Sequence, residues 1–276
     1  MPYVSASDGT ALFYADTDGE HPVVFLSSAS MGIRWWDAHV PGLVARGRRC
    51  VRYDRRGHGR SDWPWRGYDY DTLADDLHQL IEHLDLRDVT LVGYAMGGGE
   101  AVRYLTRHGA QRVRRLMLVA STTPVLLQSP GNPDGVPPEV VEGLLAALQA
   151  DRPRLLAETA APFLVGAPGT ATDLPLSPEM VQWICQLSLE CSLHANVEVY
   201  RTLYTTDLSE DVRAVTVPTL VVHGDRDLAA PLALCGERTA RDIPDSKLLV
   251  YPGAAHGLAV THSARLTADL LAFTTD

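Results

Sequence analysis

The chain has 276 residues, 46% of them hydrophobic and 21% charged, so it is long enough to bury a full hydrophobic core and has the balance of a globular enzyme. The formal net charge of −10 argues against a nucleic-acid or anionic-membrane partner, because both bind basic surfaces. The first residues lack the basic and apolar segments of a signal peptide, and no run reaches the roughly 18 apolar residues of a membrane span. We therefore expect a cytoplasmic protein.

The cysteines show neither metal-ligand spacing nor a C-x-x-C motif; they are Cys50, Cys185, Cys191 and Cys235. Buried, reduced thiols are the expectation, and a disulfide between two of them is the alternative. Because there is no cluster of metal ligands and no G-x-G-x-x-G phosphate fingerprint, the sequence predicts no metal, flavin or nicotinamide cofactor.

Short apolar runs alternate with helical patterns through the first 120 residues. Several runs are continuously apolar, which is typical of strands buried on both faces of a parallel sheet. Strands are expected at 10–15, 23–26, 50–53, 89–92 and 113–120, and helices at 35–46, 69–84 and 99–107. The first of these helices contains Pro41-Gly42, which predicts an interruption.

The pattern changes at residue 121. Prolines mark a long loop up to about residue 138, and helical stretches are expected at about 139–149, 151–164 and 178–204. Strands return at 219–222 and 247–251, with a helix at 231–241 between them. We therefore predict an α/β fold, a doubly wound and mostly parallel sheet formed by residues 1–120 and 213–276, with residues 121–212 inserted as a helical cap.

The stretch Gly93-Tyr94-Ala95-Met96-Gly97-Gly98 lies between an apolar strand and a helical pattern. Strand, glycine-flanked turn and helix form the nucleophile elbow, G-x-S-x-G, whose central residue is held in strained backbone geometry. Glycines flank it because a Cβ there would meet the neighbouring strand or helix. The central position calls for Ser, Cys or Asp, and here it holds Ala95, whose methyl group is no nucleophile.

Two later segments carry an acid and a base. Asp225 and Asp227 follow the strand at 219–222, and His256 follows the strand at 247–251. The carboxyl ends of parallel strands meet at one edge of the sheet, where ligands bind in open α/β folds. A histidine there can take a proton from a nucleophile when a buried carboxylate fixes its tautomer.

Taken together, these motifs resemble the α/β-hydrolase superfamily, and within it 3-oxoadipate enol-lactonases and cofactor-free haloperoxidase/perhydrolase-type esterases. The lactonase likeness is carried by Leu26–Gly32, Trp36-Asp37 and Arg52–Ser61. The esterase likeness is carried by Met96–Glu100, Arg103-Tyr104, Gly253–Leu258 and Thr261-His262. The resemblance covers both core segments, and the cap carries no motif that matches.

The resemblance implies a role for each site residue. His256 would be the base, and Asp227 the acid, since it is the second acid of the G-D-x-D pattern; Asp225 would cap the loop. The oxyanion hole would consist of the backbone N–H of Met96 and of a residue in the Ser28–Ala29 stretch. No metal would take part.

Substrate contacts are expected from four side chains, Trp36, Tyr94, Trp183 and Leu258. The tryptophans fit either packing or the wall of a pocket. Two departures from the family pattern stand out. The His-Gly that often precedes the oxyanion loop is Ser27-Ser28 here, as in the lactonases, and the nucleophile position holds Ala95, as in neither group.

Three explanations of Ala95 remain open at this stage. A serine was replaced to trap substrate or product; or alanine is native, and His256 with Asp227 performs general-base chemistry of a lyase, cyclase or isomerase type; or the protein binds a small molecule without catalysis. We interpret the chain as a hydrolase of a carboxylic ester or lactone, strongly impaired as it stands, whose partner is a small-molecule substrate. A homodimer is left open.

Overall fold

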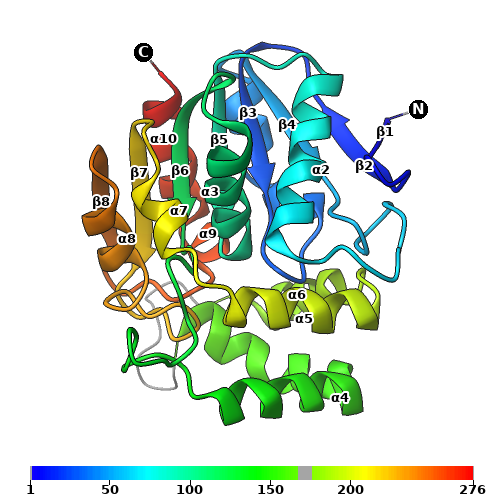
Figure 1. Ribbon diagram of the computed structural model, residues 1–276, viewed down its shortest axis with the longest axis vertical. Coiled ribbons are helices and arrows are strands. Elements are labelled where there is room, and N and C mark those ends of the chain that lie inside the picture. Colours follow the sequence, from blue (N-terminus) through cyan, green and yellow to red (C-terminus); the bar gives the residue numbers. More distant parts are fainter. Residues whose placement is uncertain (1, 167–175, 276) are drawn as a thin grey trace.

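The centre of the molecule is an eight-stranded sheet with the order β1-β2-β4-β3-β5-β6-β7-β8 (Figure 1). A computed structural model describes residues 2–166 and 176–275. The strands are β1 (Tyr3–Ser5), β2 (Ala11–Asp16), β3 (Glu20–Leu26), β4 (Arg48–Tyr53), β5 (Val89–Tyr94), β6 (Val113–Val119), β7 (Thr219–Gly224) and β8 (Ser246–Tyr251). β2 pairs antiparallel with β1 and with β4, and all other pairs are parallel, which confirms the mostly parallel sheet predicted from the sequence.

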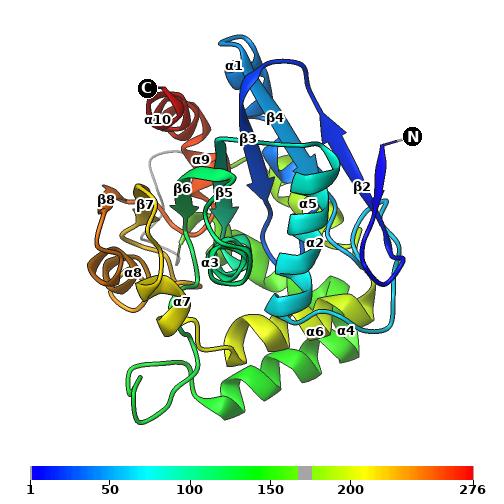
Figure 2. The ribbon, with the colours of Figure 1, turned by 45° about the horizontal axis from the view of Figure 1, so that its top comes forward.

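Helices cover both faces of this sheet (Figures 1 and 2). One face carries α2 (Tyr70–His83), α3 (Met96–His108), α7 (Ser209–Arg213) and α8 (Gly236–Asp242), and the other carries α1 (Val40–Val44), α9 (Leu258–Thr261) and α10 (Ser263–Thr274). Along β3, Val24 and Leu26 belong to one hydrophobic cluster, and Val23 and Phe25 belong to the other. Burial on both faces is the physical reason for the continuous apolar runs in the sequence.

Three further helices, α4 (Pro138–Val165), α5 (Pro178–Ser188) and α6 (Leu193–Thr205), lie beyond the carboxyl ends of the strands (Figure 1). Asp151, with φ −157° and ψ 77°, breaks α4 where the sequence predicts a boundary between two helices. All three fall within residues 121–212, the predicted cap, of which 167–175 lie outside the described residues. The boundaries of that cap stay a prediction.

Some element predictions are wrong in detail. The single helix expected at 178–204 is two helices, because Ser192 begins α6 by accepting a hydrogen bond from the Ala195 N–H. The helix expected at 35–46 is a 3₁₀ turn, η1 (Ile33–Trp36), followed by the five residues of α1. β1 was not expected, since three residues of strand carry too little periodicity to be recognised.

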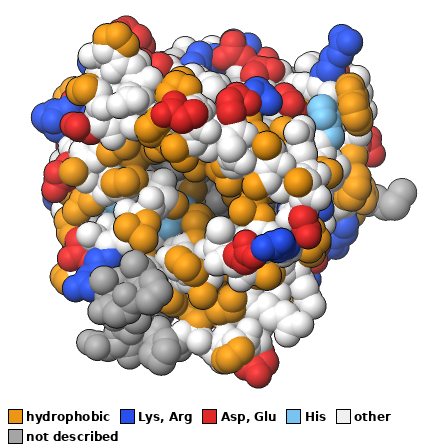
Figure 3. Space-filling view, turned by 90° about the horizontal axis from the view of Figure 1, so that it is seen from below, with side chains coloured by type: hydrophobic (Ala, Val, Ile, Leu, Met, Phe, Trp, Pro, Cys, Tyr) orange, Lys and Arg blue, Asp and Glu red, His pale blue; other side chains and the backbone are white. Residues whose placement is uncertain are grey.

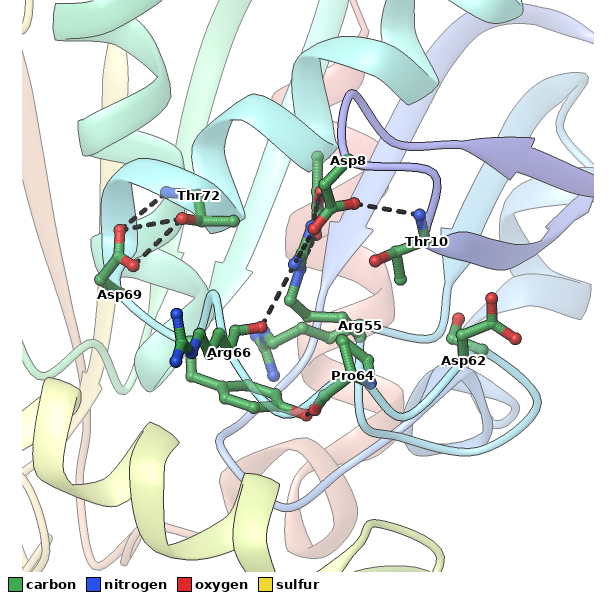
Figure 4. Close-up of polar contacts among 12 residues, drawn as sticks. Asp8, Thr10, Arg55, Asp62, Pro64, Arg66, Asp69 and Thr72 are labelled. Carbon is green, nitrogen blue, oxygen red and sulfur yellow. Dashed lines mark hydrogen bonds and ion pairs between the residues drawn. The ribbon is translucent and has the colours of Figure 1, made fainter.

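The loop between β4 and α2 is fixed by buried charge. The Arg56 guanidinium donates to both oxygens of Asp76, at 2.6 and 2.7 Å, and to Asp8 at 2.8 Å. It also reaches the Arg66 carbonyl at 3.4 Å. Figure 4 shows Asp8, which lies between β1 and β2, close to this loop and to its residue Arg55. Because Arg56 directly follows Arg55, these contacts also fix the backbone of Arg55.

All four cysteines are free, as expected, and three of them are buried: Cys50, Cys191 and Cys235. Within the described ranges, no helix has both the length and the apolar character to cross a membrane.

Candidate active site

The turn between β5 and α3 has the strained geometry predicted from its glycines. Ala95 adopts φ +49° and ψ −113° and is 1% exposed. A Cβ on Gly93 would lie 2.5 Å from the Gly97 carbonyl oxygen, and one on Gly97 would lie 2.5 Å from the Leu26 carbonyl oxygen. Both contacts are with backbone, so only glycine allows strand and helix to approach this closely. The turn therefore holds the side chain at position 95 in one fixed direction.

The structure brings His256 and Asp227 together across 29 residues of sequence, since each follows a strand at the same edge of the sheet. The His256 Nδ1 lies 2.7 Å from the Asp227 Oδ2, and both side chains are buried. The other carboxylate oxygen accepts hydrogen bonds from the N–H groups of Ala229 and Ala230, at 2.9 and 2.8 Å. A carboxylate only accepts, so the hydrogen of the imidazole sits on Nδ1 and leaves Nε2 free to take a proton.

Asp225, the other acid considered for this role, makes a different contact. The Asp225 Oδ1 accepts from the Gly253 N–H at 2.7 Å and ties the loop after β7 to the loop after β8. Asp227, and not Asp225, is the acid that bonds the His256 ring. The loop-capping role expected for Asp225 fits this geometry.

A second buried histidine lies beside the acid, and sequence reasoning missed it. His223 is 0% exposed; its Nε2 lies 2.7 Å from the Ala230 carbonyl oxygen and 3.5 Å from the Asp227 Oδ2. Burial lowers the pKa of His223, which favours the neutral ring with its hydrogen on Nε2. The V-V-H-G-D sequence at the end of β7 was the available signal, because it places a histidine four residues before the acid.

A small cavity of about 30 Å³ lies between position 95 and His256. It is lined by Ser28, Ala29, Ala95, Thr122, Phe163, Tyr200, Leu203, Tyr204, Ala229 and His256. A second cavity of about 60 Å³ is lined by residues of α4, α5 and α6 and shares Ser28, Phe163 and Tyr200 with the first. Figure 3 shows this side of the molecule hollowed near its centre, with hydrophobic side chains around the hollow. The Phe163 ring meets the His256 ring edge-on, at 4.4 Å between centroids, so an aromatic group covers the base.

The expected oxyanion donors lie at the same place. Ser28 and Ala29 line the cavity, and Met96 is the first residue of α3. The N–H of a first helical residue has no acceptor within its helix, and the helix N-terminus favours negative charge. Position 95, His256, Ser28 and Ala29 therefore line one small cavity, and Met96 directly follows position 95.

The four side chains expected to contact substrate do not line either cavity. Trp36 is 0% exposed and packs against Phe25 and Tyr94 in the core, and Leu258 is buried at the start of α9. The Tyr94 hydroxyl donates to the backbone carbonyl of His256, so it helps to fix the backbone that carries the imidazole. Trp183 lies under the Arg34 guanidinium, 5.7 Å from it.

The cavity wall comes instead from residues that the sequence did not single out. Tyr200, Leu203 and Tyr204 recur at helical spacing on α6, and that spacing was the one signal that could have found them. Phe163 gave no signal. No group of three or more potential metal ligands occurs in the described part of the chain.

A family model described as the alpha/beta hydrolase fold matches residues 22–263, a range that contains position 95, Asp227 and His256. The chain belongs to this family. A non-heme haloperoxidase of Rhodococcus erythropolis is 37% identical to this α/β-hydrolase over 99% of both chains.

Solved structures agree. An esterase from Exiguobacterium antarcticum is 31% identical, with a TM-score of 0.93 over 99% of both chains. The enol-lactonase of Burkholderia xenovorans is 25% identical, with a TM-score of 0.85 over 100% of both chains. These proteins span the two groups that the sequence motifs resemble.

Proposed function

We propose that this α/β-hydrolase cleaves a carboxylic ester or lactone in a form that carries serine at position 95, and that Ala95 is a Ser-to-Ala replacement that removes the nucleophile. The observation that carries the proposal is the buried hydrogen bond between His256 and Asp227 beside the strained turn of position 95. A histidine oriented by a carboxylate is the arrangement that removes the proton of a nucleophilic hydroxyl in this kind of site. Relatives named esterase and enol-lactonase support the reaction class.

The reaction would follow from the geometry. The serine hydroxyl would attack the carbonyl carbon while the His256 Nε2 takes its proton, and Asp227 would stabilise the imidazolium. The tetrahedral oxyanion would be bound by the N–H groups of Met96 and Ala29. His256 would then protonate the leaving alkoxide and later activate water to release the acid.

The partner would be a small molecule. The wall of the cavity is mainly apolar, with the hydroxyl groups of Ser28, Thr122, Tyr200 and Tyr204 as its polar side-chain atoms next to the His256 imidazole. The second cavity continues beyond Phe163 with a mainly apolar lining, which favours an apolar group on the substrate. We expect no cofactor and no nucleic-acid or membrane partner, and the cytoplasmic location and a homodimer remain predictions.

The test is to install the nucleophile. Ala95→Ser should raise the rate on a chromogenic acetate ester or a simple γ-lactone by about 10³-fold or more over the Ala95 protein. Adding His256→Ala to Ala95→Ser should remove the gain. An Ala95→Ser protein that stays silent on a broad ester and lactone panel would refute the proposal.

A second function is favoured by one observation: the dyad is complete although no nucleophile is present. His256 would then act as a general base in a proton-transfer or ring-forming reaction, with the oxyanion donors stabilising an enolate or alkoxide. In that case the Ala95 protein would be active, Ala95→Ser would bring no gain, and His256→Ala would abolish the reaction. Non-catalytic binding is disfavoured, since a binder needs no oriented base.

A further inference from the structure

The direction of the Ala29 N–H is fixed by the peptide that it shares with Ser28. The carbonyl of Ser28 and the N–H of Ala29 belong to one planar trans peptide, so they point in opposite directions. Whatever binds the Ser28 carbonyl on one side therefore turns the Ala29 N–H to the other side.

Arg55 binds that carbonyl. Its Nη1 donates to the Ser28 carbonyl at 3.3 Å, and its Nη2 donates to the Ser27 carbonyl at 2.9 Å. The next carbonyl, of Ala29, lies 2.7 Å from the His58 Nε2. The carbonyls of Ser27 and Ser28 are thus both bound by Arg55, while Ser28 and Ala29 line the cavity. This arrangement turns the Ala29 N–H away from Arg55.

The same guanidinium reaches the helix that carries the other donor. Glu100, one turn into α3 from Met96, accepts from the Arg55 Nε at 3.0 Å and from Nη2 at 2.7 Å. The Tyr53 hydroxyl donates to the remaining oxygen of Glu100. The pair therefore links the loop that supplies the Ala29 N–H to the helix that supplies the Met96 N–H.

This pair is costly to bury, which makes its geometry informative. The Arg55 side chain is 3% exposed and that of Glu100 is 0% exposed. Burial lowers the pKa of Arg55 to about 10 and raises the pKa of Glu100. A buried ion pair is weak evidence for stability, since desolvation offsets the attraction of the charges. Two apolar side chains in place of this pair could fill the space but could not donate hydrogen bonds to the carbonyls of Ser27 and Ser28.

We propose that Arg55, held by Glu100, is a positioning residue of the oxyanion hole: it sets the direction of the Ala29 N–H relative to the Met96 N–H. The inference rests on the proposed function, because it assigns Arg55 a part in the same reaction. Arg55 touches neither the reacting atoms nor the cavity and acts through the backbone of Ser28.

Kinetics of Arg55→Lys in the Ala95→Ser protein test the role. Lysine keeps the charge but loses the fork that binds carbonyl and carboxylate together. We expect kcat to fall about 10²-fold and KM to change less than about threefold, because oxyanion contacts strengthen in the transition state. Arg107→Lys is the matched control; this residue lies on α3 and pairs with Asp71 and Asp75 at the surface. A higher KM with unchanged kcat, or no effect, overturns the inference.

A double variant separates positioning from stability. Arg55→Met leaves Glu100 without its partner and should lower the melting temperature. Adding Glu100→Gln removes that uncompensated carboxyl and should restore much of the melting temperature but none of the lost kcat. Recovery of kcat together with stability would show that Arg55 serves only to support the fold.

Crystal structures of the Ala95 protein, with and without Arg55→Lys, give a readout that needs no activity. We expect the Ser28–Ala29 peptide to rotate in the variant. An unmoved peptide overturns the inference whatever the kinetics. A rotated peptide together with a silent Ala95→Ser protein would refute the proposed hydrolysis and leave Arg55 as the residue that orients Ala29.

Discussion

At position 95 the backbone carries a strain that its present side chain does not use. A non-glycine residue at φ +49° and ψ −113° is destabilised by about 1–3 kcal/mol, and persists only when its surroundings enforce it. The enforcement comes from Gly93 and Gly97, which allow β5, α3 and β3 to close around the turn. A serine gains from this geometry because its hydroxyl faces the cavity, whereas an alanine gains nothing. This conformation supports the proposal that position 95 belongs to a nucleophile.

The identity of the acid can be tested in the Ala95→Ser protein. Asp227→Asn should lower kcat by about 10³- to 10⁴-fold, because an amide can donate to Nδ1 and so favours the wrong tautomer of His256. Asp225→Asn is the control and should change kcat by less than about threefold, since Asp225 bonds the Gly253 N–H and not His256. Steady-state kinetics on one chromogenic ester measure both. Equal losses would contradict the assignment.

At the scale of elements, the site depends on how closely α3 approaches the sheet. Gly93 and Gly97 bring the first turn of α3 against β5 and the end of β3, and Leu26 at that end leads into the loop of Ser27 and Ser28. The two proposed oxyanion donors therefore belong to segments whose backbones are in close contact. The close backbone packing of these elements limits the distance between the two proposed donors, and Arg55 would orient one of them.

Gly97→Ala tests this packing. The new Cβ would lie 2.5 Å from the Leu26 carbonyl oxygen, so β3 or α3 must shift, and we expect a loss of about 2 kcal/mol or more in the free energy of unfolding. Gly143→Ala is the matched control. It lies in α4, where the new Cβ would meet no atom within 4 Å apart from its own helix backbone and chain neighbours, and the free energy of unfolding should rise by up to about 1 kcal/mol. Urea unfolding measures both; a neutral Gly97→Ala would contradict the packing argument.

For the whole molecule, buried neutral histidines set the response to acid. Burial lowers the pKa of both His39 and His58 to about 4, below the value near 6.5 of an unfolded chain. Between these values the unfolded state binds more protons than the folded state. The free energy of unfolding is therefore retained above about pH 6.5 and falls as the pH drops toward 4, by at most about 1.4 kcal/mol per pH unit for each group.

Removing one of these histidines should flatten that profile. His39 is 0% exposed and lines neither cavity of the site; Thr267 and the Ala259 carbonyl hold its ring. We expect His39→Gln to reduce the difference in free energy of unfolding between pH 7 and pH 5, measured by urea unfolding at each pH. His83→Gln, at an exposed position on α2, should leave the difference unchanged. An undiminished difference in His39→Gln would show that His39 does not titrate in this window.

The sequence alone determined the parts that depend on local chemistry. Continuous apolar runs identify buried parallel strands, and α2 was predicted within a residue or two, since Leu73, Leu77, Leu80 and Ile81 recur on one face. Gly93 and Gly97 identify the turn because only glycine fits there. Asp227 and His256 could be placed at one edge of the sheet because each follows a strand.

Only the tertiary structure decided what depends on contacts between distant residues. Trp36 and Tyr94 lie in the core rather than the cavity, whereas Phe163 of α4 and Tyr200 of α6 line the cavity. Arg55 and Glu100 are 45 positions apart in the sequence, and no local pattern around either residue predicts that they pair. Periodicity and turn preferences act over a few residues, whereas the orientation of a cavity wall or of a buried charge is set by packing across the whole chain.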